Sequence, residues 1–183
     1  MRRAIILSGA GGQGLILAGA IYAEAAGVYE NKEVVQTQSY GIQARGGASQ
    51  SSVIISDTRI KYPEVLEPDI LLCLSQEAYK RFEPGLRSAG VLIIDQDLVT
   101  PDHARQDIRV VALPFTAEAE KMERRILANV IALGAMAVIT GSVKVESLSK
   151  ALSNRLPERN VPKALEGLAL GTKLAEELGV VYA

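Results

Sequence analysis

The chain has 183 residues with 20 basic and 21 acidic side chains, and its formal net charge of −1 leaves no basic surplus to neutralise nucleic-acid phosphates. Its one cysteine cannot supply the roughly four thiolates of an iron–sulfur cluster, and its one histidine excludes a His-rich metal site. The longest apolar run, residues 126–139, is shorter than the roughly 20 residues of a membrane-spanning helix. We therefore expect a cytoplasmic protein that binds neither nucleic acid nor membrane.

The first third of the sequence alternates between strand-like and helix-like segments. The predicted elements are strands at 3–8, 33–39 and 51–56, a helix at 15–26 and a glycine-punctuated loop at 40–47. The strand at 33–39 differs from the others because glutamine, threonine and serine give it a polar surface. Asp57 and Thr58 predict a turn, and we expect a short edge strand to follow through Tyr62 until Pro63 closes it.

Apolar stretches in the middle of the chain predict buried strands, and the last third predicts helices. The strands are expected at 70–74, 91–94 and 108–113, and the helices at 76–82, 116–140 with a break near 121–123, 145–152 and 162–178. Ser75 and Asn160 are expected to cap the first and last of these helices, and Gly141 and Gly179 to end two of them. This order predicts an α/β protein with three layers, a mostly parallel or mixed sheet flanked by helices, and a helical C-terminal third. We expect residues 1–183 to form a single domain.

The segment Gly9–Gly14 reads G-A-G-G-Q-G and stands between a predicted strand and a predicted helix. Glycines here permit positive φ and close backbone approach, and exposed amides at a helix start favour an anion by roughly 0.3–1 kcal/mol. The candidate ligand-binding residues in this loop are Gly11, Gly12, Gln13 and Gly14. Three interpretations stay open: a dinucleotide, another anionic group such as a CoA phosphate, or glycines that serve only a sharp turn and tight helix–sheet contact. Dinucleotide binding has the weakest support, because Gln38 rather than an acid stands at the end of the second strand.

A second unusual segment, residues 36–47, reads Q-T-Q-S-Y-G-I-Q-A-R-G-G. It gathers amides, hydroxyls, a phenol and a guanidinium, and its last two glycines free the backbone beside Arg45, whose planar fork suits a carboxylate or phosphate. The alternative is an exposed loop in which Arg45 forms a solvated ion pair worth under about 1 kcal/mol. The candidate binding residues here are Tyr40, Arg45, Gly46 and Gly47. We expect both glycine loops to face the same edge of the sheet.

Other polar side chains have structural interpretations that we favour over chemical ones. Cys73 lies inside an apolar strand and is expected in the core. Asp95 and Asp97 follow a strand, where a role in forming a turn is favoured over ligand binding. Asn129 interrupts an apolar helix and must find a hydrogen-bond partner if it is buried. No residue of the chain is therefore assigned as catalytic or as a metal ligand.

Several short motifs follow one another along almost the whole chain. They are G-A-G-G-Q-G at 9–14, Q-T-Q-S-Y-G followed by A-R-G-G-A-S within 36–49, E-P-D at 67–69, L-S-Q-E-A at 74–78, N-V-I-A-L-G at 129–134 and L-P-E-R at 156–159 ahead of Asn160. In this order and spacing they resemble the gamma subunit of the 2-oxoacid:ferredoxin oxidoreductases. Residues 36–40 are most similar to the 2-oxoglutarate branch of that family. The chain departs from the family loop at Ile42 and Gln43, where a Pro-Glu pair is common.

The resemblance implies a division of labour among subunits. Thiamine diphosphate, Mg²⁺ and iron–sulfur clusters belong to partner subunits in this family, and CoA is a co-substrate, so the chain is not expected to be active alone. The implied reaction converts 2-oxoglutarate, CoA and oxidised ferredoxin into succinyl-CoA, CO₂ and reduced ferredoxin. The implied partners are alpha and beta subunits, with a delta subunit left open, and ferredoxin through the complex. The chain's implied role is to pack on the thiamine-diphosphate subunits, with a contribution to CoA binding as one option.

Two rival interpretations stay open beside this one. A stand-alone dinucleotide-binding oxidoreductase could use the Gly9–Gly14 loop, and a pure scaffold could contribute no ligand contacts at all. Isolated from partners, the chain could also expose apolar surface and pair with itself as a homodimer.

Overall fold

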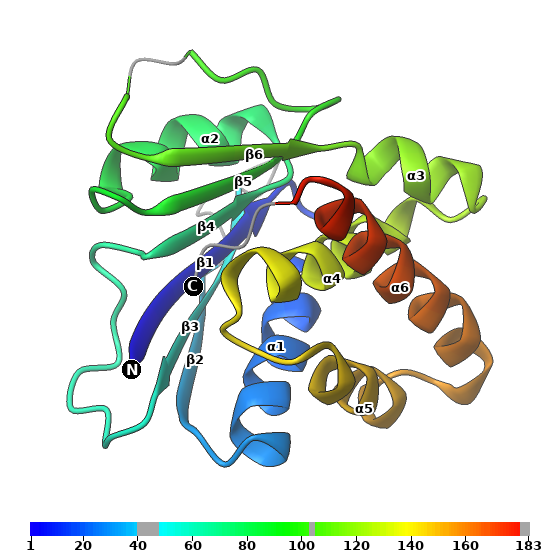
Figure 1. Ribbon diagram of the computed structural model, residues 1–183, viewed down its shortest axis with the longest axis horizontal. Coiled ribbons are helices and arrows are strands. Elements are labelled where there is room, and N and C mark those ends of the chain that lie inside the picture. Colours follow the sequence, from blue (N-terminus) through cyan, green and yellow to red (C-terminus); the bar gives the residue numbers. More distant parts are fainter. Residues whose placement is uncertain (40–47, 103–104, 180–183) are drawn as a thin grey trace.

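The computed structural model describes residues 1–39, 48–102 and 105–179. Within these residues, six strands form one mixed sheet in the order β2–β3–β1–β4–β5–β6 (Figure 1). The strands are β1 (Arg2–Gly9), β2 (Glu33–Ser39), β3 (Ser49–Ser56), β4 (Ile70–Cys73), β5 (Val91–Asp95) and β6 (Arg109–Leu113). β1, β4, β5 and β6 run parallel, whereas β3 is antiparallel to both of its neighbours, β1 and β2. The expected α/β class with a mixed sheet is confirmed.

The parallel half of the sheet forms because short, continuous apolar runs are buried on both faces. Every residue of β4 and β5 is buried, whereas β2, at the edge of the sheet, contains no fully buried residue. The register aligns Ile5 of β1 with Ile70 of β4, and Ile70 with Val91 of β5. The carboxyl ends of the parallel strands therefore meet at one edge of the sheet, which we call the carboxyl edge.

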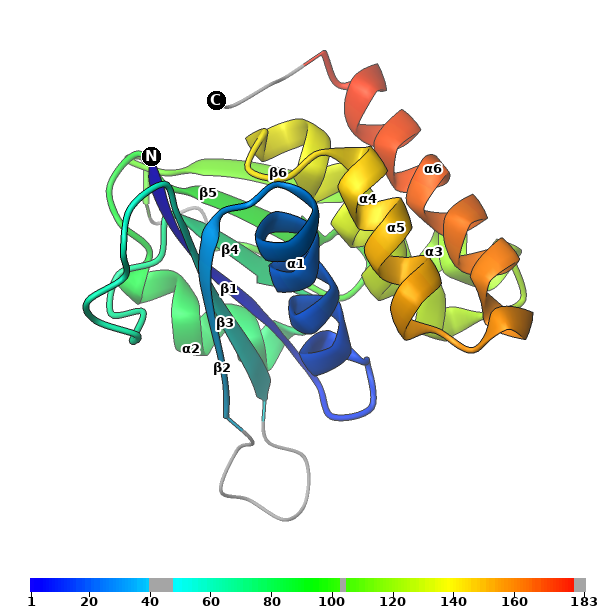
Figure 2. The same cartoon turned by 90° about the horizontal axis from the view of Figure 1, so that it is seen from below.

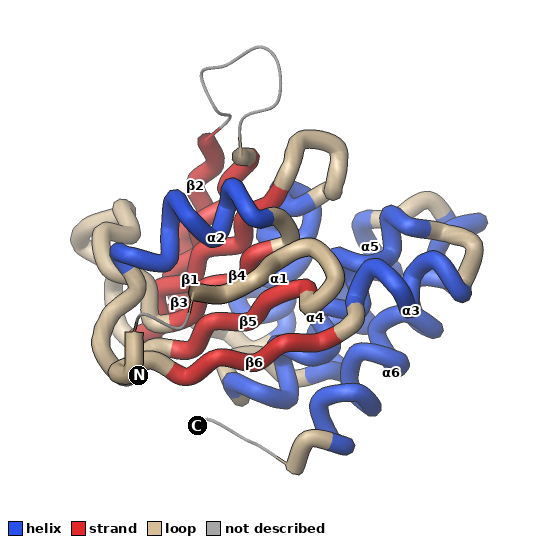
Figure 3. Tube along the Cα trace, turned by 90° about the horizontal axis from the view of Figure 1, so that it is seen from above, coloured by secondary structure: helices blue, strands red, loops and turns tan. Residues whose placement is uncertain are grey.

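Helices cover both faces of the sheet and give the three expected layers. Figures 2 and 3 show α2 on one face and α1, α4, α5 and α6 on the other. The helices are α1 (Leu15–Tyr29), α2 (Gln76–Phe82), α3 (Phe115–Lys121), α4 (Ala128–Thr140), α5 (Val145–Arg155) and α6 (Val161–Glu177), with 3-10 turns at Glu83–Gly85, Arg125–Leu127 and Glu158–Asn160. Ile5 and Leu7 of β1 join the larger core beneath α1 and α4, and Ile6 joins the smaller core beneath α2. No helix in the described ranges is long and apolar enough to cross a membrane.

α4 and α6 cross with their backbones in direct contact. A Cβ atom built on Gly171 of α6 would lie 1.8 Å from the carbonyl oxygen of Ile131, and one on Gly134 of α4 would lie 2.2 Å from that of Leu168. Because no side-chain carbon fits so close to backbone, only glycine is accommodated at these two positions. Every residue of α4 except Val138 is buried as a result of this contact and of the sheet beneath it.

Local signals predicted where several elements begin and end. Ser75 Oγ accepts a hydrogen bond of 3.2 Å from the first turn of α2, and Gly141, with a φ of 59°, ends α4. The predicted break in the long helix is confirmed, because α3 ends at Lys121 and Glu123 has a φ of 57°. Asn160 occupies the position before α6, but its side chain forms no capping hydrogen bond within the described residues.

The predicted edge strand through Tyr62 is wrong. The chain leaves the sheet after β3, and residues 57–69 contain no strand. β3 already pairs with β1 and β2, and β4 takes the other side of β1, so no free strand edge lies next to Ser56. The N–H of Thr58 instead donates to Ser56 Oγ at 3.1 Å, within the turn that the sequence predicts there.

We expect Gly171→Ala to lower the free energy of unfolding by about 2–3 kcal/mol, because the new methyl group overpacks a backbone contact. Gly167→Ala on the same helix is the matched control, since the nearest atom to its added Cβ lies 3.5 Å away. Alanine there should leave stability unchanged or raise it by up to about 1 kcal/mol through helix propensity. Urea unfolding of both variants measures the difference, and equal stability would contradict the close crossing of α4 and α6.

A second prediction concerns Asp57, whose carboxylate accepts hydrogen bonds from Lys32 Nζ and from the amino group of Met1. The bond to Lys32, followed by that to the amino group, lowers the pKa of Asp57 from 3.8 to about 2. A carboxyl with a lowered folded-state pKa stabilises the fold above its unfolded pKa, and the contribution is lost as pH falls through the folded value.

Wild-type protein should therefore be more stable than Asp57→Asn at pH 5, and the two unfolding midpoints should converge as pH falls from 3.8 to about 2. Salt should reduce the difference at pH 5, because the groups are exposed. Thermal unfolding at stepped pH tests this expectation. A difference between the two proteins that persists unchanged below pH 2 would show that the charge of Asp57 contributes nothing.

Candidate functional site

The Gly9–Gly14 loop stands at the carboxyl edge, between the end of β1 and the start of α1 (Figure 1). The N–H of Leu74, just after β4, donates to the carbonyl of Ser8 at 2.9 Å, so the ends of β1 and β4 lie side by side. Gly9 is paired with Ser49, the first residue of β3. In open α/β sheets this edge is where ligands bind.

The side chain of Gln13 folds back over the loop and fixes its shape. Gln13 Oε1 accepts a hydrogen bond from the N–H of Ala10 at 2.7 Å, and Gln13 Nε2 donates to the carbonyl of Leu74 at 2.8 Å. A Cβ atom on Gly9 would lie 2.2 Å from Gln13 Oε1. Gly9 therefore makes room for Gln13, and Gln13 ties the loop to β4.

Asn129 holds the other side of the loop. This residue is buried in the first turn of α4, and its Nδ2 donates to the carbonyl of Gln13 at 2.9 Å. A Cβ atom on Gly14 would lie 2.4 Å from the same Nδ2, and Gly14 has a φ of 73°. The structural hydrogen bond expected of Asn129 is confirmed, and Gly14 is explained by contact within the chain.

Gly11 and Gly12 differ from the other loop glycines. Gly12 has a φ of 88°, which favours glycine, but a Cβ atom on either residue would meet nothing within 4 Å. Within the described residues, the N–H groups of Gly11 and Gly12 donate no hydrogen bond. Contact within the chain thus explains Gly9 and Gly14, and conformation explains Gly12. Neither explains Gly11, so the tip of the loop has open amides and open space.

A cleft of about 310 Å³ opens beside this tip. Its lining residues are Gly11, Gly12, Gln13, Thr116, Arg125, Ile126 and Ala128. The side chain of Arg125 is 68% exposed and lies 3.7 Å from Glu120, a distance that leaves most of its donors to solvent. Two open backbone amides and a guanidinium suit an anionic group such as a phosphate or carboxylate.

A buried hydrogen-bond cluster supports the far wall of the cleft. The carboxylate of Asp95, which is fully buried at the end of β5, accepts hydrogen bonds from the N–H and Oγ1 of Thr116 at 2.8 and 2.6 Å. Its other oxygen accepts from the N–H of Asp97 at 3.0 Å. The turn-forming role expected for Asp95 is confirmed. Cys73 is also in the core as expected, where burial raises the pKa of its thiol.

Four predicted site residues, Tyr40, Arg45, Gly46 and Gly47, lie outside the described residues. The described residues that flank them do reach the carboxyl edge. Ser39, at the end of β2, pairs with Gln50, and Ser49 Oγ donates to the carbonyl of Gly9 at 3.3 Å. The chain therefore enters and leaves this segment close to the Gly9–Gly14 loop. The role of the four predicted residues in binding stays a prediction.

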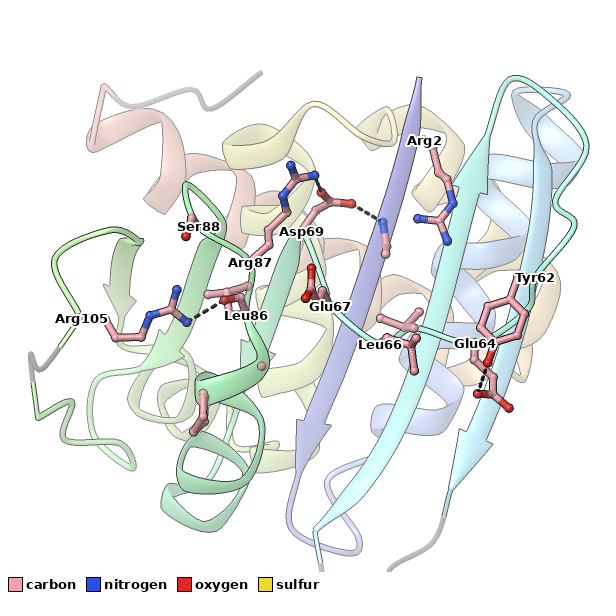
Figure 4. A pocket seen from close by; sticks show the side chains of 14 residues that line it. Arg2, Tyr62, Glu64, Leu66, Glu67, Asp69, Leu86, Arg87, Ser88 and Arg105 are labelled. Carbon is pink, nitrogen blue, oxygen red and sulfur yellow. Dashed lines mark hydrogen bonds and ion pairs between the residues drawn. The ribbon is translucent and has the colours of Figure 1, made fainter.

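A larger cavity, of about 790 Å³, lies at the opposite edge of the sheet (Figure 4). Most of its polar side chains already form hydrogen bonds or ion pairs with one another or with the backbone. Asp69 accepts from the N–H of Ala4 at 2.7 Å and from Arg87 at 2.5 Å, and Arg105 donates to the carbonyl of Leu86 at 2.6 Å. These contacts join the 57–69 segment and the turn after α2 to the sheet. We therefore place the candidate site at the glycine loop, where donors are open.

Four residues of the cleft were not predicted from the sequence: Thr116, Arg125, Ile126 and Ala128. They come from α3, from the turn before α4 and from the start of α4, more than 100 residues after the glycine loop. Asn129 was the one local signal, because a lone amide in an apolar helix requires a partner. That signal indicates a hydrogen bond but does not say to which segment.

Comparison with known proteins gives matches over nearly the whole chain. The family model described as pyruvate ferredoxin/flavodoxin oxidoreductase matches residues 4–174. The 2-oxoglutarate synthase subunit KorC of Methanocaldococcus jannaschii is 47% identical over 180 residues, covering 97% of this chain and 96% of the relative. The crystal structure of a keto/oxoacid ferredoxin oxidoreductase gamma subunit from Geobacter sulfurreducens matches with a TM-score of 0.88 and 43% identity, covering 97% of this chain and 98% of that one.

A further match concerns a longer protein. The 2-oxoglutarate:ferredoxin oxidoreductase of Magnetococcus marinus shares the fold with a TM-score of 0.89 at 21% identity. The match covers all of this chain but 33% of the Magnetococcus chain. The same fold therefore also occurs as one part of a longer polypeptide.

We expect Gly12→Val to lose about 1–3 kcal/mol of stability, because valine is strained at positive φ even where space is open. Gly11→Val is the matched control, since Gly11 has no positive φ and equally open surroundings. The isolated chain carrying Gly11→Val should unfold within about 0.5 kcal/mol of wild type. Chemical denaturation of the three proteins measures both values. Equal stability of the Gly12 and Gly11 variants would show that Gly12 is unstrained.

Proposed function

Because the chain belongs to the pyruvate ferredoxin/flavodoxin oxidoreductase family, we propose that it works as the gamma subunit of a multi-subunit 2-oxoglutarate:ferredoxin oxidoreductase. The reaction of the complex is 2-oxoglutarate plus CoA plus oxidised ferredoxin giving succinyl-CoA, CO₂ and reduced ferredoxin. The 47% identity to a 2-oxoglutarate synthase subunit along nearly the full length of both chains supports this assignment. The proposal takes residues 1–183 as one domain and places the complex in the cytoplasm.

Other subunits carry the reactive groups in this proposal. Alpha and beta subunits, with or without a delta subunit, hold thiamine diphosphate, Mg²⁺ and the iron–sulfur clusters and deliver electrons to ferredoxin. The single cysteine of this chain is buried in β4 and supports that division, since a cluster needs about four accessible thiolates. The chain then contributes shape, backbone donors and contact surface. Isolated, it is expected to be inactive and free to form a homodimer.

The observation that carries the proposed role is the open tip of the Gly9–Gly14 loop. Gly11 has no positive φ, a Cβ atom built on it would meet nothing within 4 Å, and its N–H has no hydrogen-bond partner within the described residues. Close approach of a group from outside the chain, either a CoA phosphate or a partner subunit, would explain why this position is a glycine. The residues proposed to meet it are Gly11, Gly12, Gln13, Gly14 and Arg125, with Tyr40, Arg45, Gly46 and Gly47 proposed from the sequence.

A stand-alone dinucleotide enzyme fits the sheet poorly. A Rossmann site uses an acid at the carboxyl end of the parallel strand next to β1 to bind the ribose. Here the neighbour of β1 on that side is the antiparallel β3, whose carboxyl end, Ser56, lies at the opposite edge. β2 is one strand further away and ends in Ser39. The loop sequence resembles the glycine motif of dinucleotide-binding sites, but the sheet provides no position for the acidic residue that binds the ribose.

Reconstitution tests the proposal. We expect purified partner subunits to reduce ferredoxin with 2-oxoglutarate and CoA only when this chain is added. The Gly11→Val variant should assemble a complex whose CoA-dependent turnover is lower by about tenfold or more, because the added side chain fills the open tip.

Gly85→Val serves as the control, since Gly85 lies at the opposite edge and its Cβ would stand 3.9 Å from the nearest atom. Full activity of the partner subunits without this chain would contradict the assignment as a gamma subunit. Full activity and normal assembly with Gly11→Val would leave that assignment standing and remove the role of the loop.

A further inference from the structure

A second concave surface lies next to the glycine loop. This groove, of about 290 Å³, is bounded by α1, the turn before α4, and the start of α6. Two of its large apolar side chains are widely exposed, Leu17 at 41% and Ile126 at 50%. Pro157 adds a further exposed apolar residue, and the floor is formed by buried Ile21 and Val130. Exposed apolar surface around a cavity marks a site of protein contact.

The charge of the groove is one-sided. Its lining contains Arg124 and Lys163 but no acidic residue. Lys163 is paired only with its own helix neighbour Glu166, at 2.8 Å on an exposed surface, and Arg124 forms no ion pair within the described residues. A partner that carries carboxylates around an apolar side chain would therefore match the groove in both charge and polarity.

The groove is continuous with the candidate site. Ile126 lines both the groove and the cleft beside Gly11, and Leu17 lies on the first turn of α1, directly after the loop. Asn129 contributes to the groove and also holds the carbonyl of Gln13. A polypeptide that covers the glycine loop would reach the groove within the same contact.

A second copy of this chain fits the groove less well than a different partner. A symmetric dimer brings the same patch of both copies together, so Arg124 and Lys163 would face the same cations of the other copy. Like charges across an interface cost affinity.

We propose that this groove receives an apolar side chain, flanked by carboxylates, from a partner subunit of the oxidoreductase complex. The inference rests on the proposed function and adds the surface and the chemistry of the contact. Leu17 and Ile126 supply the apolar walls, and Arg124 and Lys163 bind the flanking carboxylates. The anchor side chain then fills a desolvated pocket, the geometry in which interface energy concentrates.

Two matched pairs of variants test the contact. Leu17→Glu places a carboxylate in the groove, and Val28→Glu places one at the other end of α1, where Val28 is 64% exposed. Lys163→Glu reverses a charge that lines the groove on α6. Lys173→Glu reverses the charge of another lysine of α6, which is paired with Glu177 and does not line the groove. Affinity for the purified partner subunits is measured by titration, with thermal unfolding to confirm that each variant is folded.

We expect Leu17→Glu and Lys163→Glu to weaken binding to the partner subunits by about tenfold or more, and both controls to stay within about twofold of wild type. Added salt should weaken the binding of the wild-type chain more than the binding of the Lys163→Glu variant.

Wild-type affinity in both groove variants would overturn the inference. Assembly of the wild-type complex would in that case still support the proposed function. Failure of the wild-type chain to bind the partner subunits overturns both. A homodimer that Leu17→Glu disrupts and that persists with partner subunits present would assign the groove to a second copy instead.

Discussion

The shape of the candidate site depends on two amide side chains. Gln13 joins the glycine loop to β4, and Asn129 joins it to α4, so segments distant in sequence meet at the Gly9–Gly14 loop. Both amides form hydrogen bonds with backbone groups. Asn129 is buried, so loss of its partner would leave a buried polar group unpaired. Asn129 is itself held in place by α4, which the close glycine crossing with α6 fixes against the sheet.

This chain of contacts explains how a protein with few reactive side chains can serve a reaction. The loop is fixed from inside the chain by Gln13 and Asn129. At its tip, the N–H groups of Gly11 and Gly12 donate no hydrogen bond within the described residues, and a Cβ atom on either residue would meet nothing within 4 Å. The cleft with Arg125 and the groove with Leu17 adjoin that tip and share Ile126. One continuous surface at the carboxyl edge thus combines backbone donors, a guanidinium and apolar walls. It is suited to contact and to positioning rather than to bond breaking.

The sequence predicted the fold better than the site, for physical reasons. Short apolar runs and capping residues such as Ser75 are local signals, and they located the strands and several helix ends. The edge strand through Tyr62 was wrong because its absence depends on which strand edges are already occupied, which no local pattern reveals. The role of each loop glycine also depended on distant residues. Gly14 requires Asn129 as its neighbour, and the cleft requires Arg125, both more than 100 residues away.

The central claim is that the open amides of Gly11 and Gly12 are covered only when the chain joins its complex. Hydrogen exchange at these two amides, compared between the isolated chain, the assembled complex and the complex with CoA, tests it most directly. We predict fast exchange in the isolated chain and clearly slower exchange after assembly or after CoA binding, whichever of the two covers the loop. Exchange at Gly11 and Gly12 that is equally fast in all three states would contradict the claim.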